Sequence, residues 1–432
     1  MIQVAVLGCG TVGSGVIKLL NQNQDLISHR SGCPIVLKKV LEKDRQKCLE
    51  AGLSPEMIAQ DYDEILGDDE IDIIIELIGG MEPAFQFIMS AMERGKQVVT
   101  ANKDLIAVRG KELFEMAASH NVDFYFEASV AGGIPIVYAL KQSLAGNNIK
   151  ALIGILNGTT NYILTKMSRE GRDFSEVLQE AQALGYAESD PSSDVQGTDA
   201  ARKIAILSSI AFNSRVTLDN VYVEGITSIT PEDIKYAHEL GYVIKLLAIA
   251  KEEVPGQIQI RVHPAFLPSS HPLASVNDVF NAVFIQGDAV GDIMHYGRGA
   301  GQMPTASAVV GDIIEISRNI AQHITARIGC TCYQEKKILD ISQLKSQYYI
   351  RMLANDRPGV LAGIAGVFGS NNVSIATVIQ KSSRGEQADL ILITHKTMEG
   401  DLRDALTILR GMSIVHKISN VIRVEENGQE GL

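Results

Sequence analysis

The sequence predicts an α/β protein of three domains, the first of which is a doubly wound parallel sheet. Short apolar segments alternate with helical patterns over the first 135 residues, which is typical of strands buried on both faces of a parallel sheet. A glycine-rich motif follows the first of these strands, and the C-terminal part has a different order of strands and helices. A chain of 432 residues is also too long for one typical domain.

The expected elements of the first domain follow one another as strand and helix. Strands are expected at 2–10, 34–43, 72–80 and 97–103, and helices at 12–23 and 85–95. The strand segments are short and apolar, whereas the helical segments repeat their apolar residues three and four apart. We assign residues 1–135 to this domain.

After residue 135 the pattern changes twice. Residues 136–335 combine helical candidates at 174–184 and 200–212 with apolar strands, which predicts an α+β domain. The polar segment 335–348 is expected to be a linker or a connecting helix. Residues 346–426 then give strand, helix, strand, strand, helix and strand, the order of a ferredoxin-like fold.

The composition favours a cytoplasmic protein that acts on small molecules. The net charge of -12 argues against a nucleic-acid or acidic-membrane partner, because binding phosphates requires a basic surface. No segment has the length and apolarity of a membrane span, and the first residues lack a secretory signal. The five cysteines are scattered and odd in number, so we expect buried or incidental thiols rather than disulfides or a metal site.

The motif "GCGTVG" predicts a dinucleotide-binding, Rossmann-type domain. Gly8 allows the tight turn after the first strand, Gly10 lets the backbone approach a pyrophosphate, and Gly13 permits close packing of helix on strand. The N-terminus of the helix adds a positive potential for the phosphates. A purely structural glycine turn is the alternative, and the position of the motif between a strand and a helix favours the dinucleotide.

The end of the second strand leaves the choice between NAD and NADP open. An acidic residue there selects the ribose of NAD, whereas a basic residue accommodates the 2′-phosphate of NADP. The sequence offers both, because Glu42 and Asp44 alternate with Lys43 and Arg45.

Two further residues lie where strands of the first domain end. Lys103 follows an apolar strand at the carboxyl edge of the sheet, where an ammonium can meet a carboxylate, a phosphate or a developing alkoxide. A surface lysine is the alternative. Glu127 precedes a glycine-rich turn, and a carboxylate with nearby carbonyls suits a small cation. A glutamate that caps or stabilises the turn is the simpler interpretation of Glu127.

A candidate catalytic segment is "GYAESDPSSDVQGTDAARK". Asp199 and Lys203 stand four residues apart at the start of an expected helix and therefore share one face. Glycine and proline before the helix allow Glu188 and Asp194 to fold back toward that face. The alternative is a surface ion pair behind a solvated acidic loop, and spacing alone does not decide. Asp190 and Asp194 either shape the turn or help to set the charge of the lysine.

These motifs resemble the homoserine dehydrogenase family. Segments in the family's order span nearly all of residues 1–320, namely "GCGTVGSGV", "ELIGG", "VVTANK", "EASVAGGIPI", "GILNGTTNYIL", "GYAESDPSSDVQGTDAARK" and "GRGAGQMPTASAVVGD". Residues 348–425, with "NDRPGVLAGIAGVFGSNNVSI", are similar to an ACT domain, a small amino-acid-sensing module. The two resemblances imply a nucleotide-binding domain (1–135), a substrate-binding and dimerisation domain (136–335) and an ACT regulatory domain (346–426).

The resemblance implies the reversible NAD(P)-linked oxidation of L-homoserine to L-aspartate 4-semialdehyde, a step toward threonine, methionine and isoleucine. Lys203 would be the catalytic acid and base, and Lys103 would lie between cofactor and substrate. Glu188 and Asp199 would bind the substrate, and we add Asp194 to this group. The family's pattern also implies the residues that contact the cofactor and a structural sodium ion. For the cofactor they are Gly8, Gly10, Thr11, Val12, Gly13, Lys103, Gly185 and Gly301, and for sodium Glu127 with the carbonyls of Val130, Gly132 and Ile134.

The similarity to an ACT domain implies feedback regulation, with threonine as the expected effector. The segments 355–361 and 371–375 are where ACT domains commonly receive an amino acid at a subunit interface. A module that serves only dimerisation is the alternative. In either case we expect a homodimer or a homotetramer.

Three other functions are less consistent with the residues. An aspartate-semialdehyde dehydrogenase requires a cysteine nucleophile, and none of the cysteines lies in a setting typical of one. A non-enzymatic amino-acid sensor has no use for the proton-transferring Lys203. A fusion to aspartokinase is not expected, because no kinase-sized segment precedes the first strand.

Overall fold

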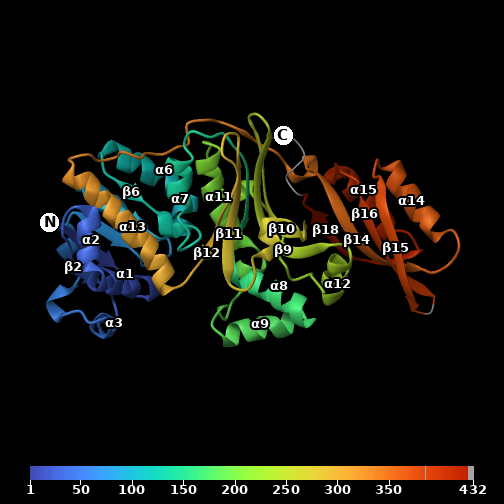
Figure 1. Ribbon diagram of the computed structural model, residues 1–432, viewed down its shortest axis with the longest axis horizontal. Helices are drawn as coiled ribbons and strands as arrows, with labels where there is room; N and C mark the ends of the chain where they lie inside the picture. Colours follow the sequence, from blue (N-terminus) through green and yellow to red (C-terminus); the bar gives the residue numbers. More distant parts are fainter. Residues whose placement is uncertain (385, 427–432) are drawn as a thin grey trace. The chain divides into compact units, whose positions relative to one another are not determined.

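The chain folds into two compact units whose segments alternate along the sequence (Figure 1). The computed structural model describes residues 1–384 and 386–426. Unit 1 comprises Met1–Leu152, Arg202–Asn220 and Asn281–Glu335, and unit 2 comprises Ile153–Ala201, Val221–Phe280 and Lys336–Leu432. Three elements run from one unit into the other, namely β7 (Ile149–Ile155), α11 (Thr198–Ala211) and β11 (Phe280–Gly287). The domain boundaries expected near residues 135, 335 and 346 stay predictions, because each of these two units combines several separate segments of the chain.

Unit 1 contains the predicted doubly wound parallel sheet. Its strands are ordered β3-β2-β1-β4-β5-β6, and each neighbouring pair is parallel. This order, with the reversal beside β1, is that of a dinucleotide-binding sheet, so the predicted fold class is confirmed. The strands are β1 (Ile2–Leu7), β2 (Ile35–Leu41), β3 (Ile58–Ala59), β4 (Ile73–Glu76), β5 (Gln97–Thr100) and β6 (Phe124–Tyr125).

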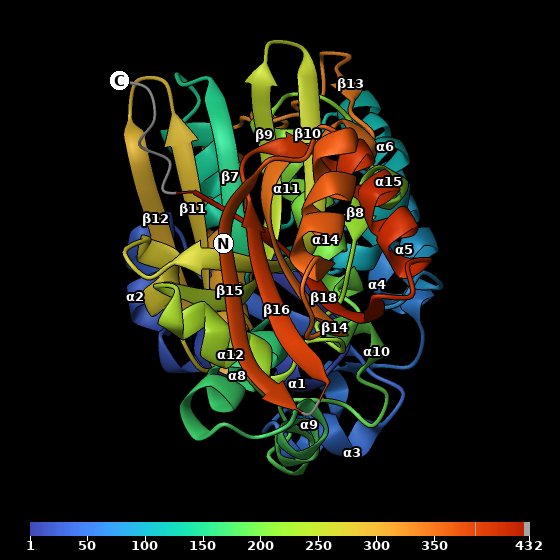
Figure 2. The same ribbon diagram turned by 90° about the vertical axis from the view of Figure 1, so that its right-hand side faces the viewer.

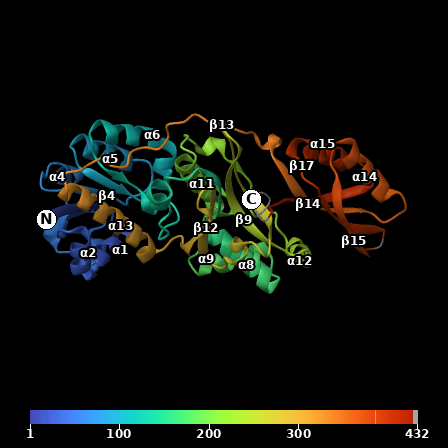
Figure 3. The same cartoon turned by 45° about the horizontal axis from the view of Figure 1, so that its top comes forward.

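Helices cover this sheet, and one of them returns from much later in the chain. They are α1 (Thr11–Gln22), α2 (Gln24–Ser31), α3 (Arg45–Glu50), α4 (Tyr62–Leu66), α5 (Ala84–Glu93), α6 (Lys103–Ser119), α7 (Ile136–Tyr138) and α13 (Gln302–Ala321). Helix α13 lies against α1 and α2 (Figures 1 and 3). Its apolar side chains join those of β1, β4 and α1 in one buried core. Strand β12 (Gly291–Arg298) precedes α13 in the chain.

Unit 2 is built on a mixed sheet. Two long strands, β9 (Tyr242–Val254) and β10 (Gln257–Pro268), form an antiparallel hairpin, and the short β8 (Tyr222–Val223) and β13 (Lys337–Ile338) pair with β10 in parallel. The helices outside the C-terminal module are α8 (Gly158–Glu170), α9 (Phe174–Ala183), α10 (Ser192–Val195) and α12 (Pro231–Glu239).

The C-terminal module continues this sheet in the order β10-β18-β14-β16-β15. Its elements are β14 (Lys345–Asn355), α14 (Val360–Ser370), β15 (Ile375–Arg384), β16 (Gln387–Thr394), β17 (Thr397–Met398), α15 (Glu399–Arg410) and β18 (Val415–Val424). The main strands pair antiparallel, and α14 and α15 pack side by side (Figure 2). The predicted ferredoxin-like order is therefore confirmed.

The segment 335–348 was expected to be a linker or a connecting helix. The segment 335–348 contains no connecting helix: it forms the short strand β13 and a single 3₁₀ turn at Ile341–Gln343 before β14 begins. Among the described residues no helix is long and apolar enough to cross a membrane. The cytoplasmic location stays a prediction.

Candidate functional site

The glycine motif forms a tight turn between β1 and α1. Gly8 has a φ of +100°, and a Cβ there would lie 2.8 Å from the carbonyl oxygen of Leu77 on the neighbouring loop. A Cβ on Gly13 would lie 2.0 Å from the oxygen of Gly8, so only glycine lets the helix start this close to the strand. Nothing lies within 4 Å of a Cβ on Gly10, the residue before α1. The backbone at Gly10 is thus open to a ligand in front of the helix N-terminus, which begins at Thr11 and Val12.

Glu42, the first residue after β2, is bound to the glycine loop. Its Oε2 accepts a hydrogen bond of 2.7 Å from the N–H of Cys9, and its Oε1 accepts one of 3.1 Å from the N–H of Asp44. Burial acts to raise the pKa of Glu42, but these N–H groups hold it below its usual range. Lys43 and Arg45 beside it are exposed.

A hydrogen-bonded network at the ends of β4 and β5 was not found from the sequence. The buried Glu76 accepts bonds from the N–H groups of Ile78 and Gly79 and from the hydroxyl of Thr100, at 2.8, 3.1 and 2.6 Å. Asn102 caps α6 and donates to the carbonyl of Gly80 at 2.6 Å. The network therefore holds the loop after β4 against the start of α6. Glu76 belongs to the motif "ELIGG", but its partner lies on another strand and is not visible in local sequence.

Lys103 and Lys203 both belong to unit 1 and lie on neighbouring helices. Lys103 is the first residue of α6, at the carboxyl edge of the sheet, and is half-buried. The next residue, Asp104, forms an ion pair of 3.0 Å with Arg202 on α11, and Lys203 follows Arg202. This ion pair joins the start of α6 to the part of α11 that carries Lys203.

Asn157 connects two carboxylates of the acidic stretch in unit 2. Its amide donates to Asp194 at 2.7 Å and to Asp199 at 2.9 Å, and its carbonyl oxygen caps α8 by accepting from the N–H of Thr160. Asp199 is 7% exposed and lies in the first turn of α11. Asn157 lies in the motif "GILNGTTNYIL", but no role for it could be predicted from the sequence.

Three residues of this stretch, Gly185, Glu188 and Asp190, are exposed. Glu188 is exposed, and its carbonyl accepts a bond of 3.1 Å from Gln182. Asp190 accepts bonds from the N–H and hydroxyl of Ser192, so it shapes the turn before α10. Gly185 has a φ of +74° after α9 and lies in unit 2, whereas the other predicted cofactor residues lie in unit 1.

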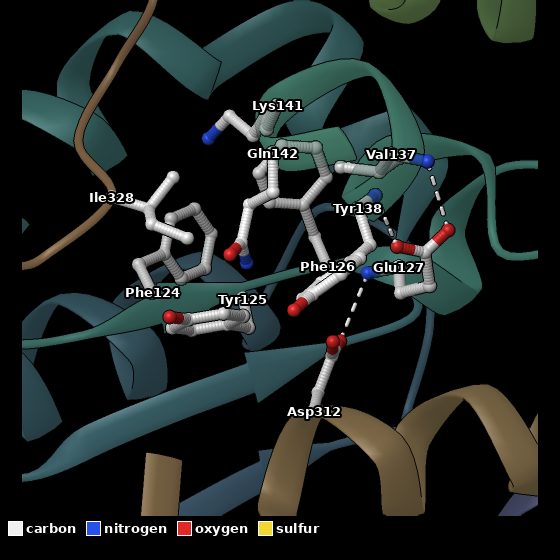
Figure 4. A pocket seen from close by; sticks show the side chains of 10 residues that line it. All are labelled: Phe124, Tyr125, Phe126, Glu127, Val137, Tyr138, Lys141, Gln142, Asp312 and Ile328. Carbon is white, nitrogen blue, oxygen red and sulfur yellow. Dashed lines mark hydrogen bonds between the residues drawn. The ribbon is translucent and has the colours of Figure 1, made fainter. Parts of the chain in front are cut away.

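Glu127 caps the short helix α7, in agreement with the prediction of a capping or turn-stabilising glutamate. Its carboxylate accepts from the N–H groups of Val137 and Tyr138 at 2.9 and 2.6 Å, which satisfies the start of α7 (Figure 4). The N–H of Glu127 donates to Asp312 on α13 at 2.9 Å. Burial raises the pKa of both carboxyl groups, and the charge of Glu127 raises that of Asp312 further.

The predicted cation loop crosses the loop before α13. Gly132 has a φ of +52°, and a Cβ there would lie 2.5 Å from the oxygen of Gly299. The N–H of Gly133 donates to the carbonyl of Arg298 at 3.1 Å. Gly301, with a φ of +124°, ends this second loop before α13 begins. Val130, Gly132 and Ile134 thus lie on one short loop that follows Glu127. The ligands that these three residues would offer to a cation are their backbone carbonyl oxygens.

Three protein-family models match successive segments of the chain. The model described as "Homoserine dehydrogenase" matches residues 135–314, and the one described as "Homoserine dehydrogenase, NAD binding domain" matches residues 8–127. The "ACT domain" model matches residues 348–412. The chain belongs to the homoserine dehydrogenase family.

Relatives that match over the whole chain support this membership. The homoserine dehydrogenase of Bacillus subtilis is 44% identical and covers 99% of both chains, and that of Corynebacterium glutamicum is 44% identical over 98% of this chain and 96% of its own. The solved homoserine dehydrogenase of Thiobacillus denitrificans has a TM-score of 0.93 at 42% identity, covering 98% of each chain. The chain is accordingly an oxidoreductase with an NAD(P)-binding domain and a C-terminal ACT domain, as the sequence predicted.

The cysteines of this homoserine dehydrogenase chain lie in different settings. Burial raises the pKa of Cys9, in the glycine loop, to about 12. Cys330 has a different setting from the one expected: a hydrogen bond with Cys332, with Arg215 and Lys141 nearby, lowers its pKa to about 5. Among the described residues, no three His, Cys, Asp or Glu side chains form a group that could hold a metal ion.

Proposed function

We propose that this chain catalyses the reversible oxidation of L-homoserine to L-aspartate 4-semialdehyde. The observation that carries the proposal is the Asp104–Arg202 ion pair, which joins the first turn of α6 to α11 and so brings the segments bearing Lys103 and Lys203 together in the nucleotide-binding unit. Membership of the homoserine dehydrogenase family supports the choice of substrate.

The residues have separate tasks in this reaction. The nicotinamide supplies or accepts the hydride when bound. In the reducing direction the aldehyde oxygen requires a proton, which the ammonium of Lys203 donates; in the oxidising direction Lys203 accepts the proton of the alcohol. The carboxylates of Glu188 and Asp199, with Asp194, bind the ammonium of the substrate. Lys103 supports the developing alkoxide with a second positive charge.

The residues around the glycine loop suit either NAD or NADP. The tight turn between β1 and α1 leaves the backbone open for a pyrophosphate. Its residues include Gly8, Gly10, Thr11, Val12 and Gly13. The carboxylate of Glu42 is already engaged by backbone N–H groups, and two exposed cations flank it. Those cations would meet the 2′-phosphate of NADP. A solved relative, a hyperthermophilic archaeal homoserine dehydrogenase 27% identical to this chain, is described in complex with NADPH.

The central experiment replaces Lys203. Lys203→Ala is expected to lower kcat by at least about a hundredfold, the scale of general acid–base catalysis, with the Kd for NADPH little changed. Lys111→Ala, on the exposed face of α6, is the matched control and should retain normal turnover. Near-normal turnover in Lys203→Ala would contradict the assigned role.

A sodium ion at the loop of Glu127, Val130, Gly132 and Ile134 is part of the proposal. The supporting observations are two buried carboxylates, Glu127 and Asp312, whose pKa values are raised by burial, and a loop with backbone carbonyls beside Glu127. Replacing NaCl by choline chloride at equal ionic strength should lower the Tm. An unchanged Tm would argue against the ion.

The ACT domain is proposed to mediate feedback inhibition by threonine, in a homodimer or homotetramer. The segments 355–361 and 371–375 follow β14 and α14, where an effector would be received. Threonine should lower the rate of homoserine oxidation and raise the Tm, and light scattering should give two or four chains per particle. If threonine changes neither rate nor Tm, this part of the proposal is wrong.

A further inference from the structure

A pocket of about 170 Å³ lies in unit 2, between α15 of the ACT domain and the segment that follows β8. A site that holds one water requires roughly 10–15 Å³, so this pocket has room for a small molecule. It lies at the start of β14 and the end of β18, whereas the effector segments proposed above follow the end of β14 and the end of α14. The pocket is lined by Glu224, Tyr348, Glu399, Leu402, Arg403, Leu406, Arg410, Val421 and Arg423.

One side of the pocket is closed by a buried ion network. Arg423, whose side chain is 4% exposed, donates to Glu224 at 2.9 Å and to both oxygens of Glu399 at 2.6 and 2.9 Å. Tyr348 donates to Glu399 at 2.7 Å, and Tyr222 donates to Glu224. Because its donors are engaged by these groups, Arg423 holds the wall together rather than binding a ligand.

The two other arginines lie on the exposed face of α15. Arg403 and Arg410 are seven residues apart, so both side chains project from the same face of the helix. Hydrogen bonds from Ser342 lower the pKa of Asp340, and the positive charge of Arg403 lowers it further. Within residues 1–384 and 386–426, Arg410 has no ion-pair partner within 4.0 Å, although it lines the same pocket as two carboxylates.

The lining therefore presents three kinds of group to one small ligand. Arg410 is a cation with open donors, suited to a carboxylate. Glu224 is 37% exposed and keeps acceptor capacity beyond its two bonds, which suits an ammonium. Leu402, Leu406 and Val421 add an apolar surface to the same lining. A cation, a carboxylate and an apolar surface in one small pocket match an α-amino acid with a short apolar side chain.

We propose that this pocket binds such an amino acid, with its carboxylate on Arg410 and its ammonium on Glu224. The ligand joins a helix of the ACT domain to Glu224, so its binding stabilises their contact. The proposal goes beyond the reaction above and concerns a site other than 355–361 and 371–375.

The test is calorimetry on the full chain with L-alanine, L-valine and L-isoleucine, each alone. At least one should bind, and Arg410→Ala should weaken that binding at least tenfold. Lys417→Ala, which changes an exposed cation on β18 outside the pocket lining, is the matched control and should bind normally. Both variants are expected to fold, because each changes an exposed side chain; their Tm values without ligand verify this.

Several outcomes would overturn the proposal. They are no binding by any of the three amino acids, equal affinity of Arg410→Ala and the unaltered chain, and equal affinity of the N-acetylated amino acid, which lacks the ammonium. Binding of acetate or inorganic phosphate as tight as that of the amino acid would mean a simple anion site. Equal weakening of binding by Lys417→Ala would contradict a specific role for Arg410. Because binding is read without turnover, these results are independent of the dehydrogenase assay.

Discussion

At the residue scale, Asn157 has two separable tasks: it caps α8 with its carbonyl oxygen and donates its amide to Asp194 and Asp199. Asn157→Ala should remove both and cost about 1 kcal/mol for the cap alone. Asn157→Ser keeps a capping oxygen but has no amide to hold the two carboxylates together. We expect the KM for homoserine to rise several-fold in both variants, because the geometry of Asp199 is lost in both.

The comparison of the two variants decides whether Asn157 positions the substrate-binding carboxylate. Tm from thermal unfolding should be higher in Asn157→Ser than in Asn157→Ala, while the two share a raised KM. If Asn157→Ser restores the KM as well as the Tm, Asn157 acts only through the helix cap.

Asp312 provides a prediction about pH at the same scale. Burial and the nearby Glu127 raise its pKa well above its usual range, so the folded chain keeps a proton that the unfolded chain releases. Stability therefore falls as the pH rises from about 4, the value of a free aspartate, through the pKa of the folded state. Asp312→Asn retains an acceptor for the N–H of Glu127 and carries no charge, so it should raise the Tm more at pH 8 than at pH 5.

Asp69→Asn is the control for Asp312, because Asp69 is exposed. Its effect on the Tm should be small at both pH values. A Tm increase of equal size at pH 5 and pH 8 for Asp312→Asn would exclude ionisation as the cause.

At the scale of elements, the packing of α13 on α1 depends on a glycine outside the dinucleotide motif. A Cβ on Gly15 would lie 2.8 Å from the carbonyl oxygen of Gln302 and 3.1 Å from the Cβ of Ala306. Gly15→Ala should therefore lower the free energy of unfolding by about 1–3 kcal/mol, despite the better helix propensity of alanine. Gly311 lies on α13 with nothing within 4 Å of its added Cβ, so Gly311→Ala should stabilise the chain by up to about 1 kcal/mol. Urea unfolding measures both, and a stabilised Gly15→Ala would disprove close contact at this crossing.

The elements also reveal what local sequence can predict. The strands of the parallel sheet and the order of the ACT domain follow from apolar pattern and turns, which are local signals. The hairpin of β9 and β10 was missed because its long apolar runs fit a buried helix as well as a strand, although Pro255 and Gly256 mark its turn. The return of α13 to α1 was missed because no local pattern encodes contacts between distant segments.

The residues of the candidate site likewise comprise some that local sequence signals can predict and some that depend on contacts between distant segments. The glycine loop, Lys103 and Asp199 could be proposed from the sequence because each follows a strand or opens a helix in a recognisable motif; their roles stay predictions. Glu76 and Asn157 were missed because their importance comes from partners 24 to 42 residues away in the chain. The pKa of Cys330 is lowered mainly by a hydrogen bond with the nearby Cys332, and Arg215 and Lys141 from distant segments lower it further, a contribution that local sequence does not show.

At the scale of the whole molecule, the ACT domain is built into unit 2 by buried charges. Asp233 on α12 is fully buried and accepts bonds from Tyr349, Arg351 and Asn420 of the ACT strands at 3.1, 2.8 and 2.9 Å. Glu425, which follows β18, pairs with Arg261 of β10 at 2.8 Å. Strand β18 also pairs directly with β10. Removing the domain would therefore leave Asp233 and Arg261 without the partners that their burial requires.

We therefore expect the ACT domain and the β9–β10 hairpin to unfold as one cooperative unit. Asp233→Asn leaves the guanidinium of Arg351 without its carboxylate, so it should destabilise unit 2 by about 3–5 kcal/mol, the cost of breaking a buried pair. Hydrogen exchange should then become faster in α12, β10 and β14 together, while Asp404→Asn, on the exposed face of α15, should leave all three unchanged. Faster exchange confined to β14, with β10 as protected as before, would mean that the ACT domain unfolds independently. In the cooperative case, an effector bound at the ACT domain changes the stability of the hairpin as well, which gives regulation a physical route out of the domain.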